Sequence, residues 1–132
     1  AAGDVQVIFA APSNLMGQVA SGKLRPLAVS SLTRFPPLAA IPTIHEAGIP
    51  GLAKFEAIAW NGLVAPAGTP LAIIIRLNRE INAALMLPAV KQKMFAASIA
   101  PGGGTPDAFA RLIKAEASKW GEVIRATGAK VD

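Results

Sequence analysis

Cysteine and tyrosine are both absent from the 132 residues, and histidine occurs once. Without cysteine the chain can form no disulfide and offers no thiolate ligand for a metal ion. The single histidine, His45, has no second ligand candidate at helical spacing, so the sequence predicts no metal site and no cofactor. Zero cysteines suit a cytosolic or a periplasmic protein alike, and they leave the compartment open.

Long hydrophobic runs are also missing. No apolar run approaches the roughly 20 residues that a membrane-spanning helix needs, and no segment reads as a signal peptide. The sequence opens directly on a strand-like segment, Asp4–Phe9. We therefore expect this chain to be a piece of a protein whose upstream sequence is not included.

Aromatic residues are few, at 5%, although the net charge is +5. The basic residues are spread singly, and the closest of them, such as Lys91 and Lys93, form no more than pairs. Nucleic-acid interfaces gather positive charge on one face and often add stacking aromatics. The sequence predicts no nucleic-acid partner.

What the chain does contain is 52% apolar residues, with 16% charged residues, which predicts a well-buried globular fold. The first unit has a βαβ pattern: strand 4–9, a helix from Leu15 capped by Ser13 or Asn14 and ended near Gly22, then strand 24–30. Such a unit implies a right-handed parallel crossover.

Later segments continue the alternation, and together they predict an α/β fold with short parallel strands. In chain order we expect a helix at 44–47 capped by Thr43, an extended run at 55–64, a helix at 70–86 behind the Thr69 cap, a helix from Pro88, a brief strand at 98–100, and a last helix from Thr105-Pro106 to Gly128. The composition changes near residues 50–55, the best candidate for a crossing between two lobes.

No arrangement of residues predicts catalysis. Gly102–Gly104 lacks the lysine of a phosphate-binding loop, and Thr105-Pro106 after it predicts a capped helix start. Ala10–Asn14 is more promising as a binding loop, because it follows a predicted parallel strand and leads into a helix N-terminus, where α/β proteins bind ligands. An ordinary N-cap is the alternative for Ser13 and Asn14.

The pattern as a whole resembles the tripartite tricarboxylate transporter receptors, which are Bug-type periplasmic solute-binding proteins. The resemblance rests on 3–9 (GDVQVIF), 21–30 (SGKLRPLAVS), Ile41-Pro42-Thr43, Glu46-Ala47-Gly48, 60–70 (WNGLVAPAGTP), Arg76-Leu77-Asn78, Ile81, Ala84-Leu85, Thr105-Pro106, Phe109 and Lys119-Trp120. These segments keep the family's order over nearly the whole chain, which looks like the C-terminal portion of a longer receptor.

The resemblance implies a two-lobed, periplasmic-binding-protein-like architecture with parallel-rich sheets. Residues 1–54 would belong to the second lobe, 55–64 would form a strand across the hinge, and 65–132 would return to the first lobe. Such a receptor is not an enzyme; it captures a small organic carboxylate in the periplasm, is monomeric at full length, and delivers the solute to the permease subunits of a membrane transporter.

On the same resemblance, the ligand would be lined by Ala10, Ala11, Pro12 and Ser13 from one side, with Trp60 and Asn61 at the hinge. Two departures from the family pattern stand out: Ala10 replaces a frequent acidic residue, and Leu52-Ala53-Lys54 lengthens a loop. Two alternatives stay open, a small hydrolase- or transferase-like α/β enzyme domain using Ser13 or His45, and a receptor-derived sensor or interaction module.

Overall fold

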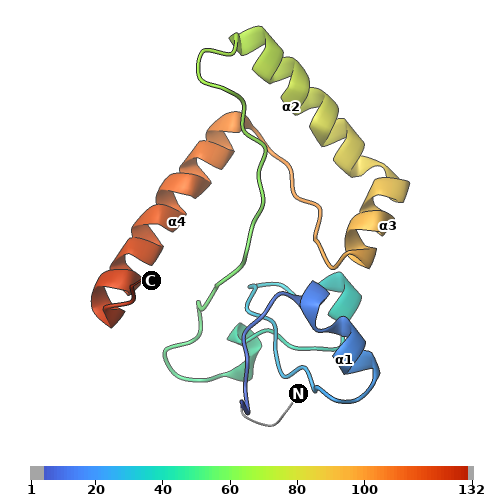
Figure 1. The fold of residues 1–132 in the computed structure, drawn as a ribbon, viewed down its shortest axis with the longest axis vertical. Helices are drawn as coiled ribbons and strands as arrows, with labels where there is room; N and C mark the ends of the chain where they lie inside the picture. Colours follow the sequence, from blue (N-terminus) through green and yellow to red (C-terminus); the bar gives the residue numbers. More distant parts are fainter. Residues whose placement is uncertain (1–4, 131–132) are drawn as a thin grey trace. The chain divides into compact units, whose positions relative to one another are not determined.

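Seven helical segments make up the regular structure of residues 5–130, the part of the chain that this computed structural model describes (Figure 1). Four are α-helices and three are single 3₁₀ turns. In chain order they are η1 (Pro12–Asn14), α1 (Met16–Ala20), η2 (Pro36–Leu38), η3 (His45–Ala47), α2 (Leu71–Met86), α3 (Pro88–Ala96) and α4 (Pro106–Thr127). Among the described residues, no helix is both long enough and apolar enough to cross a membrane.

The chain forms two compact units, which are described separately below. One consists of Ala1–Asn61 with Met86–Pro101, and the other of Gly62–Leu85 with Gly102–Asp132. Contacts within a unit do not define the lobes of a receptor. The lobe boundaries expected at residues 54 and 64 therefore stay predictions.

The predicted sheet is not confirmed. Over residues 5–130 the three segments expected as strands form no ladder, and the regular pairing there is one isolated parallel bridge between Val29 and Thr43. The brief strand expected at 98–100 is absent too: Ser98 has a left-handed backbone with φ 59°. A strand needs a neighbour for its N–H and C=O groups, and sequence pattern alone does not supply one.

The first unit is organised by hydrogen bonds around the Val29–Thr43 bridge. Val29 N donates to Pro42 O at 2.9 Å, and Ile44 N donates to Val29 O at 2.9 Å. Thr43 is 1% exposed, the one fully buried side chain of the described residues. Its hydroxyl accepts from Glu46 N at 3.1 Å, while Glu46 Oε2 accepts from Thr43 N at 2.7 Å. This reciprocal pair is the bonding of a capping box at Thr43, but the helix expected at 44–47 is a single 3₁₀ turn that begins at His45 with Ile44 as its cap residue.

Helix α2 begins at Leu71, one residue later than predicted, because the Pro70 carbonyl accepts the first two helical bonds, from Ile73 N and Ile74 N. The Thr69 hydroxyl donates to Pro66 O at 2.8 Å. Of the apolar residues that recur at helical spacing along α2, Ile74, Ile81 and Leu85 are half-buried, whereas Leu77 is exposed. Helix α3 begins at Pro88 as predicted and ends at Ala96, with Val90 and Met94 half-buried and Ala97 exposed beyond it.

The ends of α4 agree with prediction. The Thr105 side chain accepts from Ala108 N at 3.1 Å, Pro106 is the first helical residue, and Gly128 closes the helix with φ 66°. Each of these features is local, since it depends on residues within one turn of the helix end.

The expectation of a well-buried core is wrong for this chain. No hydrophobic side chain among the described residues is fully buried. Helix α2 shows the reason: Leu71, Ile73 and Ile75 are exposed in addition to its half-buried stripe. A helix that is apolar on more than one side needs neighbours on more than one side, and residues 5–130 provide too few.

Candidate functional site

The predicted binding loop, residues 10–14, is built from two tight turns. Ala11 is extended, with φ −64° and ψ 136°, and its carbonyl accepts from Asn14 N at 3.1 Å. The Pro12 carbonyl then accepts from Leu15 N at 2.9 Å. Pro12 is half-buried, whereas Ala10, Ala11 and Ser13 are exposed. Proline at the start of the turn fixes this bend, which presents the small side chains to the surface.

Neither Ser13 nor Asn14 caps helix α1, so that prediction is wrong. The helix begins at Met16 with Leu15 as its cap residue, and there is no side-chain cap hydrogen bond. The Ser13 hydroxyl instead lies 3.4 Å from Asn14 Oδ1, which is a long contact. Both residues belong to the 3₁₀ turn η1, and α1 begins only after it. At the other end, Gly22 is left-handed with φ 72°, as predicted.

Trp60 and Asn61 lie in the same compact unit as the loop. Both lie outside regular secondary structure, and Trp60 is 39% exposed. The segment before them is tied to residue 30: Ala57 N donates to Ser30 O at 3.0 Å, and Ser30 Oγ donates to Ala57 O at 2.6 Å. Sequence reasoning did not identify Ser30, because the 27 residues that separate it from Ala57 leave no periodic signal.

The three-glycine loop before α4 is held by two asparagines of α2. Asn78 Nδ2 and Asn82 Nδ2 donate to Gly104 O at 2.8 and 3.0 Å, and Gly104 N donates to Asn82 Oδ1 at 2.8 Å. The Gly104 N–H group is thus already bonded within the protein. These asparagines were missed at the sequence level, although their spacing of four places both on one face of a helix.

His45 is engaged structurally. Its Nδ1 lies against the Ala53 carbonyl oxygen. Within residues 5–130 no group of three or more His, Asp or Glu side chains could hold a metal ion. A ring nitrogen on a backbone carbonyl is not the pairing of a base with a nucleophile that hydrolysis requires.

Glu46 and Arg34 form a bidentate ion pair. Arg34 Nε donates to both Glu46 oxygens at 3.1 Å, and Nη2 donates to Oε1 at 2.9 Å. The hydrogen bonds from Arg34, then that from the Thr43 N–H, lower the pKa of Glu46 from 4.5 to about 2, and the pair raises the pKa of Arg34. Both side chains are exposed by 40% or more, so this pair orients the Thr43 cap and does not form a buried charge site.

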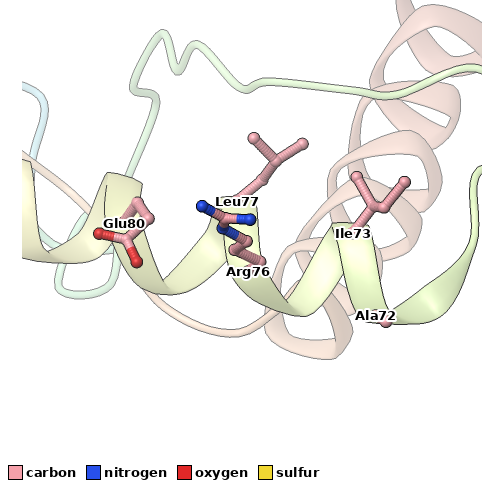
Figure 2. A pocket seen from close by; sticks show the side chains of 5 residues that line it. All are labelled: Ala72, Ile73, Arg76, Leu77 and Glu80. Carbon is pink, nitrogen blue, oxygen red and sulfur yellow. The ribbon is translucent and has the colours of Figure 1, made fainter.

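The second unit carries a hollow of about 690 Å³ along α2, lined by Ala72, Ile73, Arg76, Leu77 and Glu80 (Figure 2). All five side chains come from one helix. Ligand sites usually enclose most of the ligand, which a single helix face cannot do. This hollow is therefore not assigned as the binding site.

Comparison with known proteins gives a consistent picture. A family model described as "Tripartite tricarboxylate transporter family receptor" matches residues 1–129. A protein from the tcbD–tcbE intergenic region of Pseudomonas sp. is 38% identical over 93% of this chain and 36% of its own length. BugT of Bordetella pertussis is 39% identical over 89% of this chain and 35% of its own length.

Two solved structures are similar as well. The R. palustris protein Rpa4515, solved with adipate, has 36% identity and a TM-score of 0.72, and covers 88% of this chain and 38% of its own. The periplasmic binding protein BugD has 30% identity and a TM-score of 0.67 over the same shares. The chain thus matches part of a periplasmic-binding-protein fold, and it spans about a third of the length of the curated relatives it matches.

Proposed function

Because the chain belongs to the tripartite tricarboxylate transporter receptor family, we propose that it is part of a periplasmic receptor that binds a small organic carboxylate. The receptor is a monomer that closes two lobes on the solute. It then delivers the solute to the permease subunits of a membrane transporter. The observation that carries the substrate class is the similar R. palustris structure, which was solved with adipate. The Bug-type relatives support the receptor role and the compartment.

The loop at residues 10–14 fits this role chemically. Ser13 does not cap helix α1, which was the main alternative role for its side chain. Its exposed hydroxyl can therefore donate a hydrogen bond to a carboxylate. The alanines beside it let a ligand approach the backbone closely. We assign Ala10, Ala11, Pro12 and Ser13 to one wall of the site.

Trp60 and Asn61, which belong to the same unit as the loop, complete the proposed site. The asparagine amide and the indole N–H are both donors, and a carboxylate accepts hydrogen bonds only. The net charge of +5 favours an anionic solute over a cationic one. Bridging waters would supply contacts that these short side chains do not reach.

The test is thermal unfolding of the chain with a panel of mono-, di- and tricarboxylates, adipate first. A ligand at 100 times its Kd stabilises the folded state by about 2.7 kcal/mol, enough to raise the melting temperature measurably. Ser13→Ala should reduce the shift. The matched control is Ser21→Ala, since Ser21 Oγ bonds Gln18 O at 3.1 Å at the far end of α1.

Two results would count against the proposal. One is a panel in which no carboxylate shifts the melting temperature. The other is a shift that Ser13→Ala and Ser21→Ala reduce equally, which would place the ligand away from the loop.

A further inference from the structure

Ser30 makes two hydrogen bonds to a single residue, Ala57. The Ala57 N–H donates to the Ser30 carbonyl at 3.0 Å, and the Ser30 hydroxyl donates to the Ala57 carbonyl at 2.6 Å. Both backbone polar groups of Ala57 are therefore used by one partner. Two bonds fix the direction of the segment at Ala57, whereas one bond would leave it free to rotate about that bond.

Ser30 directly follows Val29, which forms the isolated bridge of its unit. Its neighbour Val29 is bonded on both sides, to Pro42 and to Ile44, at the bridge with the buried Thr43. Leu32 N also donates to Glu56 Oε1 at 3.5 Å, next to Ala57. The segment at 56–57 is thus hydrogen-bonded to residues 30–32, which follow the bridge and form its support.

Trp60 lies three residues after Ala57, and Asn61 follows it in the same segment, which has no regular secondary structure. The direction of the backbone at Ala57 therefore sets where these two side chains lie relative to the support. We propose that Ser30 is a positioning residue for the carboxylate site: its hydroxyl, without touching the ligand, holds the segment that presents Trp60 and Asn61. The link to the ligand rests on the proposed function, while the link to Trp60 does not.

The chain offers a matched control for this hydroxyl. Ser31 is adjacent, and its Oγ donates to Thr33 O at 2.7 Å, a bond within its own turn. Ser30→Ala and Ser31→Ala each remove one serine hydroxyl from neighbouring positions. Only the first removes a bond to the segment that carries Trp60, and Ser30→Thr keeps a hydroxyl there.

The first experiment needs no ligand. In a Trp120→Phe background, Trp60 is the single tryptophan, and its emission maximum and acrylamide quenching report its surroundings. We expect Ser30→Ala to shift the emission to the red and raise quenching, Ser31→Ala to leave both unchanged, and Ser30→Thr to restore them. Equal spectra for Ser30→Ala and Ser31→Ala would overturn the inference.

The second experiment measures adipate affinity by titration calorimetry. Loss of one hydrogen bond predicts that Ser30→Ala weakens binding by up to about tenfold, with Ser31→Ala within twofold of the parent. If the parent chain does not bind adipate or any other carboxylate, the proposed function fails, and the Trp60 spectra still decide the role of Ser30. A parent that binds and a Ser30→Ala variant of equal affinity would refute the positioning of the site.

Ser30→Ala could unfold its unit, which circular dichroism would reveal. Ser30→Cys then takes its place, because a thiol is a weaker donor at the same position. An intermediate Trp60 shift would support the inference, and a spectrum like that of the parent would overturn it.

Discussion

The ring of Phe109 in α4 lies directly against the backbone of Gly62. A side-chain carbon placed on Gly62 would overlap the ring and come within 2.7 Å of both Cε1 and Cε2. Real carbon atoms do not approach so closely, so residue 62 has room for glycine alone while the ring keeps this position. The contact fixes Gly62 to the N-terminal turn of α4 within the second unit.

This contact predicts that Gly62→Ala destabilises the second unit by about 1–3 kcal/mol, since overpacking forces the ring or the backbone to move. In a Phe109→Ala background the same substitution should leave the free energy of unfolding almost unchanged, because the obstructing ring is gone. Urea unfolding of the four proteins, followed by α4 circular dichroism, measures this coupling. Additive effects would contradict the packing described here.

The depressed pKa of Glu46 predicts acid sensitivity in the first unit. A carboxylate whose pKa falls from 4.5 to about 2 on folding stabilises the folded state above pH 4.5 and loses that effect as the pH falls towards 2. Glu46→Gln should lower stability at neutral pH and flatten the pH dependence in this window. Urea unfolding monitored through Trp60 at stepped pH tests it, with Glu80→Gln in the second unit as the charge control. An unchanged slope for Glu46→Gln would refute the role of the ion pair.

The asparagine pair predicts different exchange behaviour at one amide. Gly104 N donates to Asn82 Oδ1, so Asn82→Ala should speed hydrogen exchange at Gly104 and cost about 1–2 kcal/mol. Asn78→Ala removes a bond to the Gly104 carbonyl only, and should leave that amide protected. Gly103→Ala should mimic Asn82→Ala, because its added carbon would lie 2.7 Å from Asn82 Oδ1. Equal exchange in the two asparagine variants would disprove the assignment.

The cap of α4 predicts that Thr105→Ala destabilises the N-terminal turn of the helix by about 1 kcal/mol, because the Ala108 N–H loses its acceptor. Thr105→Ser keeps an oxygen in place and serves as the control. Hydrogen exchange at the Ala108 amide measures the change. Protection that survives Thr105→Ala would show that the hydroxyl is not the cap.

Local features were predictable from sequence, and distant pairings were not. The Thr105 cap and the helix ends at Gly22 and Gly128 all depend on residues a few positions apart. The predicted helix start after Ser13 and Asn14 is wrong, because both residues lie in the 3₁₀ turn η1 and α1 begins only at Met16.

The prediction of a sheet was not confirmed for a different reason. Alternation of apolar residues shows that a segment can be a strand, but the ladder requires a neighbour that the pattern does not name. The same limit hid the bonds of Asn82 to Gly104 and of Ser30 to Ala57, which span 22 and 27 residues. Of the candidate site, sequence and family resemblance could nominate the loop and the Trp60-Asn61 segment, but not the residue that supports the latter.

The segment at residues 5–9 has a consequence for how we expect the chain to behave in concentrated solution. Val5, Val7, Ile8 and Phe9 are exposed and belong to no ladder. An uncovered run of β-branched and aromatic residues is a template for intermolecular cross-β stacking, and we expect aggregation through it to compete with folding of the chain. A lysine substituted for Val7 would act as a gatekeeper against such fibrils and should keep the chain soluble at higher concentration.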